Sequence, residues 1–290
     1  MPVQDDGRPV VAGYDGSAES RLALRWAVEE ARLRFLPLLV CHAWQWPYPR
    51  LSLAPETTEV VRRMGRRVLD SGLTTAHELA PRLRVRGQLV EGTPAAALVS
   101  LSRAAELIAI GPRGTGGPDE LRIGSTVEVA AHARCPVAVV RRSGHPRAGR
   151  VAIAMEVEEA TPDSQELAVA FEEARLRRAA LLIICLCPEN ARDTRQAAVR
   201  FNTSVAMWEE RYPTVEVETL IETRSHVEVL RHAADRSDLL VVADREHDDP
   251  VDPAIGPVCR VMLREAPCTI VVTPSQARQA SPRRERLVRS

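Results

Sequence analysis

The sequence contains no lysine: all 39 basic residues of the 290-residue chain are arginine. Mechanisms that need a lysine, such as Schiff-base chemistry or a P-loop nucleotide site, are therefore excluded. The chain also lacks an excess of charge, because 39 acidic residues balance the arginines. A chain of zero net charge is not expected to bind nucleic acid or acidic lipids in a general way, and no specific nucleic-acid partner is indicated.

Long hydrophobic runs are missing as well. Residues 179–187 form one of the longest apolar stretches, and they are far too few to cross a bilayer. The first eight residues do not resemble a signal peptide. No pair of the six cysteines has the C-x-x-C spacing of a zinc or redox motif, and buried free thiols suit a reducing compartment. We therefore expect a cytoplasmic protein without a membrane partner.

The chain repeats itself. Residues 104–110 (AAELIAI) read like residues 236–242 (RSDLLVV), and residues 26–31 (WAVEEA) read like residues 169–174 (VAFEEA). Such self-similarity indicates two diverged copies of one domain, and the chain length suits two domains. We predict domains over residues 1–144 and 149–275, followed by a basic and disordered tail over residues 276–290.

Short apolar strands alternate with helical segments in both halves. This alternation predicts an α/β fold, in which two tandem, doubly wound, Rossmann-like domains each contain a five-stranded parallel sheet covered on both faces. Helices are expected to begin after Ser17, at Pro94, at Gly124 and at Thr161-Pro162. The predicted strands span residues 10–14, 38–43, 83–90, 107–110 and 137–140 in the first half, and 151–155, 181–187, 215–221, 239–242 and 269–272 in the second.

Each half ends in a short apolar strand that could lie at a sheet edge. Antiparallel pairing of these two strands would continue both sheets and remove both exposed edges. We therefore expect the two domains to pair within the chain about a pseudo-twofold axis. Whether the chain also forms a homo-oligomer is left open.

The strongest local signal is a glycine-rich segment that follows the fourth strand of the first half. Its spacing is G-x2-G-x9-G-S, with glycines at positions 111, 114 and 124. Glycines at a strand end let backbone N–H groups approach a polyanion, and the start of a helix attracts phosphate. A positive charge and hydroxyl donors are added by Arg113, Ser125 and Thr126. The alternative is that these glycines only form tight turns.

This segment resembles the ATP-binding signature of the universal stress protein family. Residues 11–17 (VAGYDGS) resemble that family's first strand and turn, and residues 91–94 and 107–141 resemble its later segments. The resemblance covers nearly all of the first half, and the second half through the repeat. It implies an ATP site, with Mg²⁺ as the accompanying ion, whose residues are Gly13, Asp15, Ala43, Gly111, Arg113, Gly114, Gly124, Ser125 and Thr126.

The resemblance also implies roles for these residues. Asp15 would lie beside the ribose and the phosphates, and the backbone near Ala43 would meet the adenine. Gly111, Gly114 and the Gly124-Ser125 pair would hold the ribose and the phosphates. His42 is assigned a packing role, whereas Trp44, Trp46 and Tyr48 either cover the adenine or pack at the domain interface.

The second half departs from this pattern. At the matching spacing, Ala243 replaces Gly111, Glu246 replaces Gly114 and Pro257 replaces Ser125. Carboxylates crowd the same loop and should repel a triphosphate; they are Asp244, Glu246, Asp248, Asp249 and Asp252. A divalent-metal site is one interpretation of this loop. A solvated acidic loop is favoured because no ligand spacing is recognisable, and no metal site is assigned.

The implied function is that of an ATP-binding regulatory protein of stress responses, with a nucleotide site in the first domain and a degenerate second domain. One alternative is a slow ATP hydrolase or nucleotidyl-transfer enzyme on the same fold. Another is an interaction module that binds no nucleotide. No catalytic residue is assigned, because no positioned base or paired-carboxylate metal site accompanies the glycine loop, and any hydrolysis should be very slow.

Overall fold

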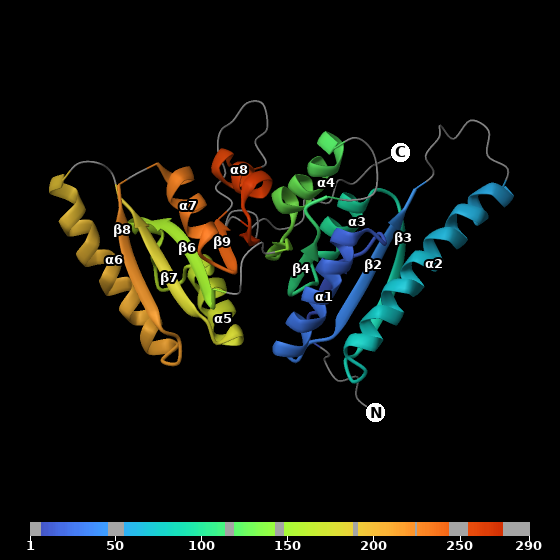
Figure 1. Cartoon of the computed structure of the whole chain (residues 1–290), viewed down its shortest axis with the longest axis horizontal. Helices are drawn as coiled ribbons and strands as arrows, with labels where there is room; N and C mark the ends of the chain where they lie inside the picture. The colour runs from blue at the N-terminus through green and yellow to red at the C-terminus, as the bar shows by residue number, and fades with distance from the viewer. Residues whose placement is uncertain are drawn as a thin grey trace, which may run out of the picture.

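The strands of the protein form one continuous sheet. We analysed a computed structural model, which describes residues 7–45, 55–113, 119–142, 148–187, 191–223, 225–243 and 255–274. The first half contributes β1 (Val10–Gly13), β2 (Leu38–Trp44), β3 (Val85–Glu91), β4 (Leu107–Ile110) and β5 (Val137–Val139). The second half contributes β6 (Arg150–Glu156), β7 (Ala180–Leu186), β8 (Val217–Glu222), β9 (Leu239–Ala243) and β10 (Thr269–Thr273). Their order in the sheet is β3-β2-β1-β4-β5-β10-β9-β6-β7-β8 (Figure 1).

Helices cover both faces of the sheet, as the near-continuous apolar strands predict. One face carries α1 (Ala18–Leu33), α2 (Pro55–Leu79), α5 (Gln165–Arg177) and α6 (Ala191–Arg211). The other carries α3 (Pro94–Leu101), α4 (Asp119–His132), α7 (His226–Asp235) and α8 (Pro257–Glu265). Successive strand residues alternate between the two cores: Val10 and Ala12 face the first layer, and Val11 faces the second. The predicted pair of doubly wound, five-stranded α/β domains is therefore confirmed.

Two of the four predicted helix starts agree with the structure. Ser17 caps α1 by accepting a hydrogen bond from the Ser20 N–H at 3.0 Å. Pro94 opens α3, and Thr93 caps it by accepting from the Ala96 N–H at 3.2 Å. Both helices thus begin where a side-chain oxygen replaces a missing intrahelical partner.

The other two predicted starts are wrong. Residues 161–162 do not begin α5: a 3-10 helix, η2 (Val157–Glu159), comes first, and Ser164 caps α5 by accepting from the Leu167 N–H. In the first half, α4 begins at Asp119, five residues before Gly124. The matching α8 does begin directly after its glycine, Gly256, with Pro257 in the first position. In α5, the capping Ser164 therefore sets the helix start in place of Pro162. In α4, the helix begins more than one turn before Gly124.

The two outermost strands are shorter at their starts than predicted. β3 begins at Val85 instead of position 83, and β8 begins at Val217 instead of position 215. Leu83 and Val215 instead close turns after the preceding helices, donating their N–H groups to Ala80 and Tyr212 at 3.0 Å. Both side chains pack against the core at the end of a helix, which accounts for their apolar character. In the sequence, an apolar residue just before a strand cannot be told apart from the first residue of that strand.

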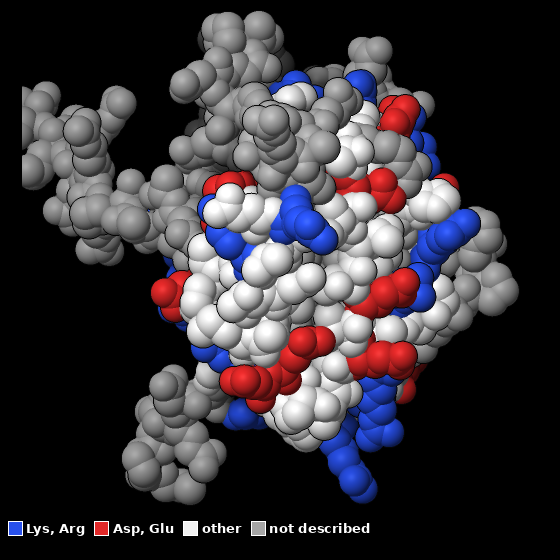
Figure 2. Space-filling view, turned by 90° about the vertical axis from the view of Figure 1, so that its left-hand side faces the viewer, with Lys and Arg blue, Asp and Glu red and all other residues white. Residues whose placement is uncertain are grey.

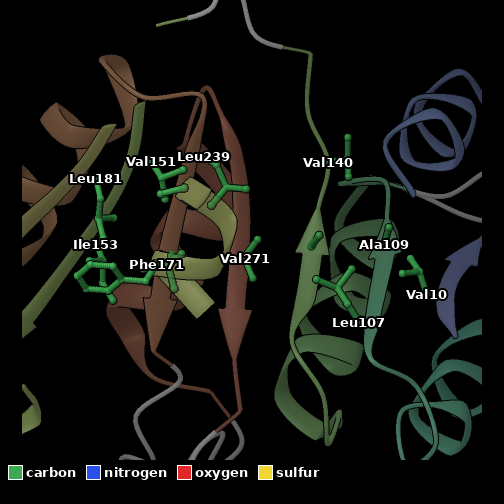
Figure 3. Packing of buried hydrophobic residues seen from close by; sticks show 14 of the residues in the cluster. Val10, Leu107, Ala109, Val140, Val151, Ile153, Phe171, Leu181, Leu239 and Val271 are labelled. Carbon is green, nitrogen blue, oxygen red and sulfur yellow. The ribbon is translucent and has the colours of Figure 1, made fainter. Parts of the chain in front are cut away.

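The two halves meet along β5 and β10, which lie antiparallel. Val139 pairs with Ile270, Ala138 with Val271, and Val137 with Val272. Figure 3 shows side chains of one buried apolar cluster on both sides of this junction, with Val271 on one side and Val140 on the other. On the other face of the sheet, the Arg141 guanidinium donates hydrogen bonds to two carbonyl oxygens at the end of α8, those of Leu263 and Arg264. The halves are thus joined by backbone pairing, apolar packing and side-chain hydrogen bonds.

A buried cluster of charges also joins the halves, and we call Glu30, Arg34, Glu173 and Arg177 the interdomain ion cluster. The Arg34 guanidinium lies 2.5 Å from Glu30 and 2.6 Å from Glu173. The Arg177 guanidinium lies 2.6 Å from Glu30 and also contacts Glu173. Both carboxylates are fully buried. Because α1 and α5 each supply one glutamate and one arginine four residues later, the cluster follows the pseudo-twofold symmetry of the fold.

The carboxylates of this cluster titrate abnormally. Burial, reinforced by the neighbouring Glu30 charge, raises the pKa of Glu173 from 4.5 to about 7. Burial also acts to raise the pKa of Glu30, but Arg177 and Arg34 together hold it below its ordinary value. Because the charge on one carboxylate disfavours ionisation of the other, the pair loses its protons in two separate steps, of which the later falls near neutral pH.

We expect the free energy of unfolding to depend on pH through Glu173. A raised pKa in the folded state means that the folded chain binds more protons than the unfolded chain between about pH 4.5 and 7. The stabilisation from this group is therefore complete below pH 4.5 and is lost as the pH rises through 7. Urea denaturation at a series of pH values, on the parent and on Glu173→Gln, measures the effect. If the pH profiles of the two proteins run parallel from pH 4.5 to 8, Glu173 does not titrate in this range.

The surface of the second half carries charges of both signs. Figure 2 looks onto the end of the molecule formed by α6 and β8, where acidic and basic side chains are interspersed with uncharged surface. Such a surface creates no field of one sign that would attract nucleic acid. Within the described part of the chain, no helix is both long and apolar enough to span a membrane.

Candidate functional site

The predicted site residues lie around the point where the strand order of the first half reverses. β1 lies between β2 and β4, and the chain leaves β1 towards β2 on one side and later returns to β4 on the other. Ligands of doubly wound sheets bind at the carboxyl ends of the strands at this reversal. Gly13 ends β1, Ala43 lies near the end of β2, and Gly111 follows β4. The fold thus brings together three segments that are about 30 to 70 residues apart in the sequence.

Asp15 is held in a tight turn between β1 and α1. Its carboxylate accepts a hydrogen bond from the Ser17 N–H at 2.9 Å, and its own N–H donates to the Ser20 hydroxyl at 3.3 Å. Gly16 between them has a φ of +81°, a backbone conformation that glycine adopts without strain. This turn holds Asp15 at the carboxyl end of β1, beside the amino end of α1.

Gly111 approaches the first turn of α1 too closely for any side chain. A Cβ atom at this position would lie 2.8 Å from the Cβ of Glu19 and 3.1 Å from its carbonyl carbon. In the second half Ala243 occupies the matching place. The residue that matches Glu19 there, Pro162, precedes α5, because this helix begins only at Gln165. The late start of α5 is therefore consistent with alanine at position 243.

Gly111→Ala should lower the free energy of unfolding by about 1–3 kcal/mol, because the new methyl group is forced against the backbone of α1. Ala243→Gly is the matched variant, and it should cost no more than about 1 kcal/mol through added backbone freedom. Urea denaturation of both proteins provides the comparison. Equal stability of Gly111→Ala and the parent would show that α1 can shift to accommodate the methyl group.

Ser125 and Thr126 lie inside α4 and not at its start. The unpaired N–H groups of an α-helix are those of its first four residues, which here begin at Asp119. The expectation that a helix start at positions 124–126 offers free N–H groups to phosphate is therefore wrong for this structure. The Thr126 hydroxyl donates to the Gly111 carbonyl at 3.3 Å and the Pro112 carbonyl at 3.2 Å, so that it ties α4 to the end of β4.

The remaining predicted residues differ in how much the structure says of them. Ala43 is half-buried near the end of β2, and Arg113 is exposed beyond β4. Gly114 lies outside the described residues, as do Trp46, Tyr48, the acidic residues 244–252 and the tail 276–290. Gly124 is placed within the helical backbone of α4.

His42 and Trp44 have structural roles. The Nδ1 atom of His42 lies 2.7 Å from the Tyr14 carbonyl oxygen, which ties β2 to the end of β1. Trp44 is buried, and its Cβ would lie 3.2 Å from a Cβ built at Gly65 on α2. The predicted packing role of His42 agrees with this geometry, whereas Trp44 packs against a helix of its own domain and not at the domain interface.

The second half contains a cavity of about 270 Å³ at the equivalent place. The strand registers of the two halves match, since Val10 pairs with Leu38 and Leu107 as Val151 pairs with Leu181 and Leu239. By this register and the motif spacing, residues of the cavity wall correspond to predicted site residues of the first half. In the order Gly13, Asp15, Ala43, Gly111, Gly124, Ser125 and Thr126, the counterparts are Ala154, Glu156, Leu186, Ala243, Gly256, Pro257 and Val258.

This correspondence shows what divergence has done to the second half. The second-half counterparts of the predicted site residues line one cavity. This supports the grouping of the predicted residues at one place in the first half. Glycine and hydroxyl side chains have been replaced by apolar ones, and the wall is completed by further apolar residues together with His226. This pocket lacks the hydroxyl groups that the motif offers to phosphate, and the Glu156 carboxylate on its wall would repel an anion.

Neither metal chemistry nor thiol chemistry is evident at these places. Within the described residues, no group of three or more histidine, cysteine or acidic side chains could hold a metal ion. All six cysteines are buried and free. Burial raises the pKa of the Cys41, Cys135 and Cys268 thiols to about 12, so these groups stay protonated and unreactive. The Cys185 and Cys187 sulfurs lie 3.4 Å apart on one face of the sheet.

Sequence reasoning missed the interdomain ion cluster. The signal was present in the repeat, because Glu30 matches Glu173 and Arg34 matches Arg177. A glutamate with an arginine four residues later is, however, typical of any exposed helix. Only the approach of α1 to α5 shows that these side chains are buried.

Comparison with known proteins agrees with this architecture. A profile described as the Universal stress protein family matches residues 7–141. Universal stress protein Rv2028c of Mycobacterium tuberculosis is 30% identical over 274 residues, which cover 92% of this chain and 96% of the relative. Universal stress protein Rv2624c of the same organism is 27% identical over 270 residues, which cover 91% and 96% of the two chains.

A solved structure is similar in fold over the whole chain. The universal stress protein from Archaeoglobus fulgidus superposes with a TM-score of 0.71 at 14% identity, covering 92% of this chain and 96% of the other. The sequence relatives span both halves of the chain, and the structural relative shares its tandem architecture. The chain therefore belongs to the universal stress protein family.

Proposed function

We propose that the protein is an ATP-binding regulator of stress responses in the cytoplasm, and that it binds one adenine nucleotide in its first domain. The domains are residues 1–144 and 149–275, and the second serves as the intramolecular partner of the first. The observation that carries this proposal is the place of three site residues: Gly13, Asp15 and Gly111 lie at the strand-order reversal of the first half, where doubly wound sheets bind ligands.

The chain offers different groups to different parts of the nucleotide. The backbone at Ala43 would meet the adenine, and Gly13 and Asp15 would lie beside the ribose and phosphates. Gly111, Gly114 and Gly124 allow close approach of the backbone, whereas Arg113 and Ser125 supply a charge and a hydroxyl group. Mg²⁺ bound to the phosphates would lower their negative charge, and Asp15 is the acidic side chain of the motif nearest to them.

The same geometry favours binding over rapid turnover. His42 is engaged with the Tyr14 carbonyl oxygen, and Asp15 is engaged with the Ser17 N–H, so neither is poised as a general base. Hydrolysis should therefore be far slower than the roughly 10 s⁻¹ of a typical enzyme. When a ligand binds reversibly and is not consumed, the fraction of protein that is occupied follows the ligand concentration. A regulator uses this occupancy as its signal.

Titration calorimetry with Mg-ATP tests the proposal. We expect one site per chain, because the second-half cavity has lost the glycine and hydroxyl residues of the motif. Mass spectrometry of the freshly purified protein should identify retained adenine nucleotide. Two equivalent sites per chain would contradict the degenerate second half, and the absence of any ATP binding would leave an interaction module as the function.

A further inference from the structure

A second and larger cavity lies between the two domains, away from the proposed nucleotide site. Its volume is about 1110 Å³. The first domain contributes to its wall the turns at the amino-terminal ends of β1, β4 and β5. The second domain contributes α5 and Tyr212, which directly follows α6. Small-molecule sites usually measure roughly 300–1,000 Å³, so the space suffices for a ligand up to the size of a nucleotide.

Arginines from three neighbouring turns line this cavity. Arg8 precedes β1, Arg103 lies in the turn before β4, and Arg134 lies in the turn before β5. β4 pairs with both β1 and β5, so the three turns lie side by side at the amino-terminal ends of these strands. All three side chains are exposed to solvent and line the same cavity.

The turns that carry these arginines are linked to one another. The Arg134 N–H donates to the Ser102 hydroxyl at 2.9 Å, which joins the turns before β5 and β4. The Glu106 N–H donates to the Pro9 carbonyl oxygen at 2.9 Å, which joins the turns before β4 and β1. These two hydrogen bonds hold the three arginine-bearing turns in place relative to one another.

The acidic side chains of the cavity wall do not neutralise these arginines. Glu172 is held by Arg175 through two hydrogen bonds of 2.6 and 2.9 Å. Glu106 lies 3.7 Å from Arg34, which also lines the cavity and belongs to the interdomain ion cluster. Within the described part of the chain, Arg8, Arg103 and Arg134 have no carboxylate partner. Three like charges are therefore gathered beside a solvent-filled space.

The repeat shows that this arrangement belongs to the first half alone. By strand register, the counterparts of Arg8, Arg103 and Arg134 in the second half are Gly149, Asp235 and Pro267. None of these three counterpart positions carries a positive side chain, although Arg236 lies next to Asp235 in the turn before β9. The basic edge is thus not a consequence of the fold itself.

We infer that this interdomain cavity binds a small anion with at least two oxyanion groups, either phosphates or carboxylates. A guanidinium presents a planar fork of N–H donors that matches both groups, and three forks lining one cavity suit a ligand with several negative oxygens. Its ligand would contact residues of both domains, and Arg34 would connect it to the buried ion cluster. The site is separate from the nucleotide site, since it lies at the opposite ends of the strands.

The test is calorimetric titration of the full chain with sodium pyrophosphate and, separately, with citrate. The chain carries Gly114→Glu throughout, so that the proposed nucleotide site does not contribute. The cavity variant is Arg8→Gln, Arg103→Gln and Arg134→Gln together. The control is Arg82→Gln, Arg195→Gln and Arg236→Gln, which changes the net charge equally at exposed positions outside the cavity.

We expect at least one of the two anions to bind, and to bind at least tenfold more weakly to the cavity variant while the control is unchanged. The preferred anion identifies the ligand as phosphate-like or carboxylate-like. If neither anion binds, or if the cavity and control variants lose affinity equally, the inference is wrong. ATP titration of the cavity variant without Gly114→Glu keeps the two sites distinguishable, because it should still show one ATP per chain.

Discussion

Arg34→Met should destabilise the protein by about 3–5 kcal/mol, the range found when one partner of a buried ion pair is removed. The substitution leaves the fully buried carboxylates of Glu30 and Glu173 with Arg177 as their remaining partner in the interdomain ion cluster. A buried carboxylate without a counter-charge costs far more than an exposed one, because it has lost its hydration. Denaturation in urea at pH 8, where both carboxylates are expected to be ionised, gives the difference.

The control for this experiment is an arginine on the same helix. Arg32 forms an exposed ion pair with Glu29 at 3.5 Å, and Arg32→Met should change the free energy of unfolding by less than about 1 kcal/mol. Replacing all four residues of the interdomain ion cluster by methionine should recover much of the stability lost by Arg34→Met, since no buried charge is then left unpaired. A loss of less than about 1 kcal/mol for Arg34→Met would show that water enters the cluster.

Gly114→Glu should weaken ATP binding by at least about 100-fold, or about 2.7 kcal/mol. The change reproduces the glutamate found at position 246 in the second half. A carboxylate about 4 Å from a phosphate charge is repelled by about 4 kcal/mol at the effective dielectric constant of a protein surface. Titration calorimetry with Mg-ATP measures the loss, and urea denaturation verifies that the variant is folded.

Two further variants separate charge from size. Gly114→Gln adds a side chain of the same length without the charge, so it should bind ATP more tightly than Gly114→Glu. Glu246→Gly in the second half should leave the stoichiometry at one, because that cavity would still lack the hydroxyl residues of the motif and would keep the Glu156 carboxylate. If Gly114→Glu bound ATP as tightly as the parent, the phosphates would have to lie elsewhere.

Much of the fold was predictable because its signals are local. Apolar strands three to seven residues long, separated by amphipathic helices, predicted the ten strands with errors of one or two residues at their ends. The helix starts after Ser17 and at Pro94 were recognisable for the same reason, since a capping side chain and a proline in the first turn both act within a few residues. The start of α4 was not, because glycine and serine at positions 124 and 125 resemble a helix start but lie in its second turn.

The candidate site stays a predicted set of residues, and its arrangement could not be predicted. The glycine spacing and its erosion in the second half are properties of the sequence. The contact between Gly111 and Glu19 depends on how α1 packs over β4, and the use of Thr126 to hold the end of β4 depends on where α4 starts. The domain boundaries and the nucleotide itself stay predictions.

The sequence by itself determined the repeat, the alternation of strands and helices, and the position of the glycine motif, because each follows from residues near one another in the chain. Only the tertiary structure decided which charges are buried and which surround a cavity. Glu30 and Glu173 are 143 positions apart, and Arg8 and Arg134 are also far apart in the sequence. Whether such side chains pair or remain open to a ligand depends on the docking of α1 and α5 across the sheet junction, which no local pattern encodes.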